Sequence, residues 1–150
     1  MGASPEAKEP SDILARQGHR LLQVGVLLLL LTSFWGFAMP ALASPRLGRS
    51  AHILAAIEAL LLLVLGLVWP KLRLGAAASR CAVLLLLYSS FAILAAFVLA
   101  SLWGAGGGTM PIAAAGAYGT AMQEAAIRWI AYSSAPTGIA AFGLLLWGLR

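Results

Sequence analysis

The sequence predicts an all-α membrane protein in which four transmembrane helices form a bundle. Composition is the first observation, because 61% of the 150 residues are hydrophobic and only 10% are charged, whereas soluble domains carry about 25% charged residues. The second observation is four apolar stretches, at about residues 21–42, 52–69, 80–103 and 124–147. About 20 helical residues cross a hydrocarbon core about 30 Å thick, so each stretch is long enough to cross once.

The segments outside these stretches set the limits of the domain. Residues 1–15 are polar and contain two prolines, so we expect a mobile tail, with a helical turn near Asp12, before a four-helix domain over residues 16–150. The long segment from Gly104 to Gly119 is typical of a functional loop, but equally of a plain surface loop. The sequence Ala41-Leu42-Ala43 resembles a signal-peptidase site. The apolar run before it exceeds the usual length of about 7–15 residues, which favours a retained helix.

The distribution of basic residues predicts the topology of the helices, because Lys and Arg concentrate on the cytoplasmic side of membrane proteins. Seven of the ten basic residues are Lys8, Arg16, Arg20, Lys71, Arg73, Arg80 and Arg150, in the tail, the second loop and the C-terminus; the other three are Arg46, Arg49 and Arg128. We therefore expect a multi-pass protein of the bacterial inner (cytoplasmic) membrane with both termini in the cytoplasm. The net charge of +5 reflects this topology, and no nucleic-acid partner is expected.

Several chemistries lack their sequence signatures. A single cysteine, Cys81, excludes an internal disulfide, and no CxxC or Cys/His pattern indicates a zinc site. The GxGxxG, Walker, HExxH and GxSxG motifs do not occur, so soluble nucleotide chemistry has no support.

Small residues predict where the helices pack. Lipid gives helices no hydrophobic reason to associate, so close packing depends on small side chains. Alanine recurs every four residues in the second stretch (Ala51, Ala55, Ala59) and in the third (Ala92, Ala96, Ala100). We expect these stripes at helix seams, with a groove for a flat ligand as the alternative. Pro136 should kink the last helix, and nearby serines can bond the freed carbonyls. A thin bundle has little interior, so we also expect a homo-oligomer.

Two ionisable residues, His52 and Glu58, stand in the second apolar stretch. A charged group at the bilayer centre costs at least about 2.5–3.5 kcal/mol, so such residues usually mark function. A neutral imidazole is a metal ligand, and haem iron often takes a histidine; a histidine bonded at the interface is the plainer alternative. Glu58 lies about 120° around the helix from His52 and about 9 Å along it, so the two face different neighbours. Glu58 could carry a proton, donate a hydrogen bond or bond a neighbouring helix.

Three further polar residues are candidates. Glu124 and Arg128 have the i, i+4 spacing that favours an ion pair, and Glu124 also stands near a helix N-terminus, where negative charge is stabilised. The pair either fixes the helix or anchors a site, for instance through Arg128 and a haem propionate. Tyr88 lies well inside the third stretch, where an interfacial aromatic belt does not account for it.

The segment around His52 resembles a known family. Ser44-Pro45-Arg46-Leu47-Gly48-Arg49-Ser50-Ala51-His52, followed by Glu58-Ala59 and Leu65-Gly66, is similar to the hydroxylaminobenzene mutases. The bacterial styrene oxide isomerases have a similar spacing after the same histidine. The resemblance continues through residues 116–119, Gln123-Glu124 and the ending Leu146–Arg150, so it covers nearly all of the chain beyond the tail.

The resemblance implies a four-helix membrane isomerase that forms a homotrimer with haem b between subunits. His52 would ligate the iron, and ferric iron would act as a Lewis acid on the oxygen of a small aromatic substrate. The mutases convert arylhydroxylamines to aminophenols by moving a hydroxyl group, while the styrene oxide branch acts on an epoxide. Both reactions are redox-neutral, so no soluble electron donor is needed.

The resemblance also suggests a role for each candidate residue. Glu58 would position or protonate the substrate, with Tyr88 as a weaker catalytic partner. Arg46, Glu124 and Arg128 would support the rim of the cofactor pocket. The family has asparagine where this chain has Glu58, and an ionised carboxylate only accepts hydrogen bonds whereas an amide also donates.

Two other functions fit the same features. A small proton-coupled exporter of hydrophobic cations would use four short spans and one deep glutamate. In small multidrug exporters, however, the acid lies in the first span, and here it lies in the second. A non-catalytic membrane subunit would need His52 and Glu58 only for stability.

Overall fold

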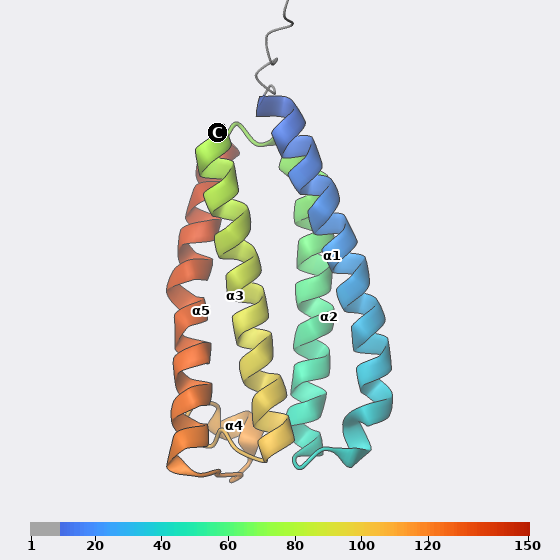
Figure 1. Ribbon diagram of the computed structural model, residues 1–150, viewed down its shortest axis with the longest axis vertical. Helices are drawn as coiled ribbons and strands as arrows, with labels where there is room; N and C mark the ends of the chain where they lie inside the picture. The colour runs from blue at the N-terminus through green and yellow to red at the C-terminus, as the bar shows by residue number, and fades with distance from the viewer. Residues whose placement is uncertain (1–9) are drawn as a thin grey trace, which may run out of the picture.

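The chain folds as a helical bundle in the computed structural model, which describes residues 10–150 (Figure 1). The long helices are α1 (Pro10–Ala38), α2 (Pro45–Val68), α3 (Ala76–Trp103) and α5 (Ala121–Gly148); the short elements are the 3₁₀ turns η1 (Met39–Ala41) and η2 (Trp69–Lys71) and the helix α4 (Pro111–Ala114). No strand occurs in residues 10–150. All four long helices are long and apolar enough to cross a membrane, which confirms the predicted four-helix fold of a multi-pass membrane protein.

Helix α2 begins seven residues before the apolar stretch that predicts it. Ser44 caps the helix by accepting a hydrogen bond from the Leu47 N–H, and Pro45 occupies the first turn, where its missing N–H costs nothing. The apolar stretch from about residue 52 marks only the later part of this helix, because its first two turns are too polar to raise the hydropathy. His52 consequently lies about two turns inside the helix, and Glu58 lies near its mid-point, about 20 Å from the start.

Helix α1 begins at Pro10, two residues before the helical turn that the sequence favours near Asp12. Residues 10–15 are therefore helical. The remainder of the predicted tail, residues 1–9, lies outside the described residues.

The long helices form two antiparallel pairs. Helix α1 packs along α2, α3 packs along α5, and α2 and α3 join the two pairs (Figure 1). Pro10, residues 69–75 and the C-terminus lie together at what we call the terminal end, where the Arg73 N–H donates to the Gly148 carbonyl at 2.7 Å. The opposite end, which carries α4 and the segment from Gly104 to Gly119, is called the loop end.

Small residues allow the close approach within the first pair. A Cβ added to Gly18 would lie 2.7 Å from the carbonyl oxygen of Gly66, and one added to Gly66 would lie 2.9 Å from the carbonyl oxygen of Gly18. Both predicted alanine stripes are buried: Ala51, Ala55 and Ala59 on α2, and Ala92, Ala96 and Ala100 on α3. The expectation that small residues line the helix seams is confirmed.

Polar groups join the second pair. The Ser89 hydroxyl of α3 donates to the Ser134 carbonyl of α5 at 2.8 Å. Helix α5 continues through Pro136, and the Thr137 hydroxyl donates to the Ser133 and Ser134 carbonyls at 3.0 and 2.9 Å. The expectation that nearby serines bond the carbonyl freed by Pro136 is not met by these bonds. That carbonyl belongs to Tyr132, four residues before the proline, whereas the Ser133 and Ser134 hydroxyls donate to the carbonyls of residues 130 and 131.

Candidate functional site

The segment at the loop end is folded around one carboxylate. Oε1 of Glu124 accepts hydrogen bonds from the N–H groups of Gly106 at 2.7 Å and Gly119 at 3.0 Å, and Oε2 accepts from Gly108 at 3.1 Å. The positive φ of Gly106, 112°, is a conformation that glycine adopts without strain. Glu124 is itself held in the first turn of α5 by a capping box between Thr120 and Gln123. The segment is therefore an ordered loop with its own anchor.

This arrangement corrects the expected role of Glu124. The i, i+4 spacing predicted a pairing with Arg128, but both carboxylate oxygens face N–H groups of the loop. Arg128 is exposed, and a Cβ on Gly108 would lie 3.4 Å from its Nη2 and 3.2 Å from Oε2 of Glu124. Glu124 thus bonds the backbone of the loop, and the guanidinium of Arg128 lies close to Gly108 on the loop surface.

Arg46 connects the loop end to the helix that carries His52. Its Nη2 donates to the carbonyl of Ile112 in α4 at 3.0 Å. A hollow of about 380 Å³ lies between Arg46, Ser50 and residues 110–113. On the other side of α2, the Trp35 indole N–H donates to the Gly48 carbonyl at 3.1 Å. The first turns of α2 are therefore fixed to both α1 and α4.

His52 faces α1 and has an unsatisfied nitrogen. A Cβ on Gly36 would lie 3.8 Å from Cε1 of His52, so the imidazole lies against the small residue of α1. Nδ1 is buried and has no hydrogen-bond partner. In a metal-bound histidine one ring nitrogen binds the metal and the other usually donates a hydrogen bond, so this nitrogen has neither kind of partner within the chain. No group of three or more His, Cys, Asp or Glu side chains in residues 10–150 could hold a bare metal ion.

Glu58 carries the second unsatisfied atom of α2. Its Oε2 is buried without a hydrogen-bond partner, although a buried polar group normally has one. Glu58 follows Ala51 and Ala55 at the i+7 and i+3 positions, so the three share one stripe of the helix. The predicted separation of His52 and Glu58 around α2 follows from the same helix geometry, since both residues lie within one continuous helix.

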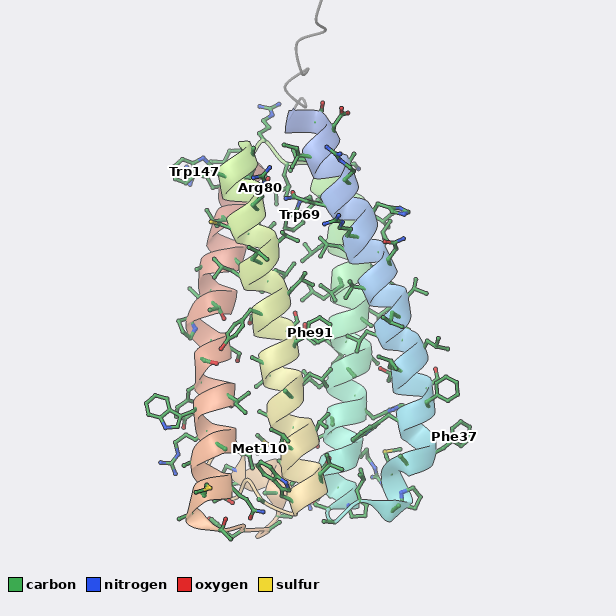
Figure 2. The ribbon with its side chains drawn as sticks, in the orientation of Figure 1. Phe37, Trp69, Arg80, Phe91, Met110 and Trp147 are labelled. Atoms are coloured by element: carbon green, nitrogen blue, oxygen red, sulfur yellow. The ribbon has the colours of Figure 1, made fainter. Side chains whose placement is uncertain are left out.

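An apolar cavity of about 180 Å³ opens on that stripe, between α1, α2 and α3. Trp35 and Phe91 supply aromatic walls, and Ala51 and Ala55 supply a shallow floor. Figure 2 shows Phe91 on the side of α3 that faces α2. The Thr32 hydroxyl, which also borders the cavity, donates to the Leu28 carbonyl at 2.6 Å. A dry cavity of about 150 Å³ lined by apolar side chains is enough to hold benzene.

Tyr88 lies apart from the other candidates. Its hydroxyl donates to the Ser133 hydroxyl of α5 at 2.9 Å, and its side chain is 51% exposed on the bundle surface. Arg46, Glu124 and Arg128 gather at the loop end, with His52 and Glu58 successively deeper along α2. Tyr88 is thus not brought to these residues within one chain.

Sequence reasoning did not single out Trp35, Thr32 or Phe91 as residues of a cavity. Each lies in an apolar stretch where aromatic and small polar residues are ordinary. The spacing of Trp35 and Thr32, three residues apart, was the available signal, because it places both on one face of a helix.

Four helices that can cross a membrane, with a half-buried histidine and glutamate that each keep one buried, unsatisfied atom, define a membrane protein with a polar site inside an apolar bundle. The family comparison identifies its class: the sequence model of the styrene oxide isomerase family matches residues 17–150. The chain belongs to the styrene oxide isomerase family.

The chain is also similar to two curated proteins of Ectopseudomonas oleovorans. It is 44% identical to hydroxylaminobenzene mutase HabB over 132 residues, which cover 88% of this chain and 80% of that protein. It is 34% identical to hydroxylaminobenzene mutase HabA over 129 residues, which cover 86% of this chain and 96% of that protein. No solved structure matches the chain at a significant level. The family and the relatives together establish a membrane isomerase of the mutase type.

Proposed function

We propose that this isomerase rearranges a small aromatic hydroxylamine, with a small aromatic epoxide as the second substrate class. The observation that carries the proposal is the pair of buried, unsatisfied polar atoms on α2, Nδ1 of His52 and Oε2 of Glu58. Similarity to two hydroxylaminobenzene mutases favours the hydroxylamine. Membership of the same family argues against the proton-coupled exporter and the non-catalytic subunit.

The unsatisfied Nδ1 of His52 supports haem b as the cofactor, because this buried nitrogen has no other partner. A bare ion is less well supported, since no group of three ligating side chains occurs in residues 10–150. His52 would ligate the iron, and Arg46 or Arg128 at the loop end would meet a propionate. The bound haem would supply a ferric Lewis acid for the substrate oxygen. Glu124 would act indirectly, because its two oxygens already bond the loop.

The chain's own residues account for binding and orientation. The cavity between Trp35 and Phe91 has the volume for one aromatic ring, and its lining is almost entirely apolar. Glu58, the next residue on the cavity stripe after Ala55, would accept a hydrogen bond from the substrate N–H or, when protonated, donate one to the substrate oxygen. Moving the hydroxyl group from nitrogen to the ring leaves the atom count and oxidation level of the molecule unchanged. No external reductant is therefore required.

A homo-oligomer, with a trimer as the first expectation, would complete the site. Large apolar side chains are exposed along both helix pairs, such as Phe37 of α1 at 86% and Ile139 of α5 at 74%. A second copy could cover such a surface beside His52 and bring its Tyr88 nearer the site. We place the assembly in the bacterial inner membrane with both termini in the cytoplasm, as the basic residues predict.

An isomerisation assay tests this function. Detergent-purified protein loaded with haem is incubated with hydroxylaminobenzene or styrene oxide without added reductant, and the products are separated by chromatography. We expect an aminophenol of unchanged mass from the hydroxylamine, with turnover lost in His52→Ala and retained in His19→Ala, which removes the other, exposed histidine. Haem-loaded protein that converts neither substrate would overturn the proposed reaction.

A further inference from the structure

A groove at the terminal end of the bundle has a composition that the isomerase site does not explain. It has a volume of about 530 Å³ and lies between α1 and α3. Three arginines stand at its mouth, Arg16 and Arg20 from α1 and Arg80 from α3. Figure 2 shows Arg80 and Trp69 at this end of the bundle. The mouth of the groove, at the level of Gly66 and Trp69, is separated from His52 by more than half of the length of α2.

The charge at this end is strongly unbalanced. Its described basic residues are Arg16, Arg20, Lys71, Arg73, Arg80 and Arg150. The only acidic side chain among the described residues at this end is Asp12, since Glu58 lies at mid-height and Glu124 at the loop end. Nε of Arg16 donates to the Asp12 backbone carbonyl at 3.2 Å, which leaves its terminal nitrogens available. The mouth of the groove therefore attracts an anion.

Gln17 supplies further hydrogen-bond donors beside the arginines. The fully buried Trp69 donates its indole N–H to Oε1 of Gln17 at 3.0 Å. Because an indole N–H can only donate, this bond fixes which end of the amide faces Trp69. The amide N–H groups of Gln17, which borders the groove, are left for another acceptor. Every polar side chain of the lining thus offers donors, which suits a phosphate group.

The remaining walls are apolar and run toward the bilayer centre. Leu21 and Val24 of α1 face Val83, Leu84 and Leu87 of α3. From Ile13 to Val24 the groove follows α1 for about 16 Å, close to half of a hydrocarbon core of about 30 Å. A free phosphate would use only the mouth, whereas a phospholipid would also cover these walls with an acyl chain.

We propose that the groove between α1 and α3 binds one anionic phospholipid, with its phosphate at Arg16, Arg20, Arg80 and Gln17 and an acyl chain along the apolar walls. The proposal does not rest on the proposed reaction. Basic pockets between transmembrane helices on the cytoplasmic side bind anionic headgroups, and the predicted topology places this end on that side.

Native mass spectrometry of the full chain in detergent tests the proposal. We expect one phosphatidylglycerol bound per chain in preference to phosphatidylcholine. The triple variant Arg16→Gln/Arg20→Gln/Arg80→Gln should weaken binding by about 100-fold, since each basic residue near the membrane surface contributes about fivefold. The matched control Lys71→Gln/Arg73→Gln/Arg150→Gln removes the same charge at the same end but outside the groove. It should weaken lipid binding far less than the first triple variant. All six side chains are exposed, so both variants should fold.

Three results would overturn the proposal. An equal loss of lipid affinity in the two triple variants would mean that general charge attraction holds the lipid. Equal retention of phosphatidylcholine would mean that the arginines do not select the headgroup. Displacement of the bound lipid by millimolar glycerol phosphate would mean a small-anion site in which the apolar walls take no part.

Discussion

Replacing Glu124 with glutamine should loosen the loop end of the protein. In the native chain the carboxylate accepts three N–H groups, from Gly106, Gly108 and Gly119. A glutamine whose oxygen takes the place of Oε1 keeps two of these bonds in neutral form and turns its NH₂ toward the Gly108 N–H. Losing one bond and leaving one donor unsatisfied costs about 1–3 kcal/mol, and weakening two charged bonds costs about 1 kcal/mol more each.

The expected loss of stability is therefore about 3–5 kcal/mol, or about 6–20 °C in Tm at about 2–4 °C per kcal/mol. Thermal unfolding followed by circular dichroism in detergent measures it, and hydrogen exchange should show the three glycine amides losing protection first. Glu58→Gln is the matched control, because Oε2 of Glu58 has no partner to lose. An unchanged Tm and unchanged amide protection in Glu124→Gln would refute the reasoning.

Three further predictions concern packing. Gly18→Ala should destabilise the protein by about 1–3 kcal/mol in thermal unfolding, since the new Cβ would lie 2.7 Å from a carbonyl oxygen of α2, while Gly143→Ala, with nothing within 4 Å, should not destabilise it. Ala55→Leu should fill the cavity and raise KM for a single-ring substrate while the protein stays folded; an unchanged KM would place the ring elsewhere. Gln17→Leu should cost about 1–3 kcal/mol in the same unfolding assay because the buried Trp69 N–H loses its acceptor, and an unchanged stability would count against that bond.

The four helices could be predicted from sequence because the bilayer fixes their length and polarity. Their ends were less accurate, since capping depends on residues that hydropathy ignores. Ser44 starts α2 within a polar segment, and Thr120 does the same for α5. The small-residue seams were predictable because lipid leaves close packing to such residues.

The site was predictable only where helix geometry decides it. The angular separation of His52 and Glu58 follows from the helical repeat. The partner of Glu124 did not follow, because the i, i+4 rule considers one helix and the competing N–H groups come from a loop folded back on it. The cavity beside Trp35 and Phe91 depends on how three helices pack, and no local pattern encodes that.

The most direct test of the central claim is the absorption spectrum of the detergent-purified protein, with haem added. If His52 is the iron ligand, the wild-type chain and His19→Ala will show a Soret band, and His52→Ala will lose or shift it. The absence of a Soret band in the wild-type protein after haem addition, or an identical band in His52→Ala, would contradict the account.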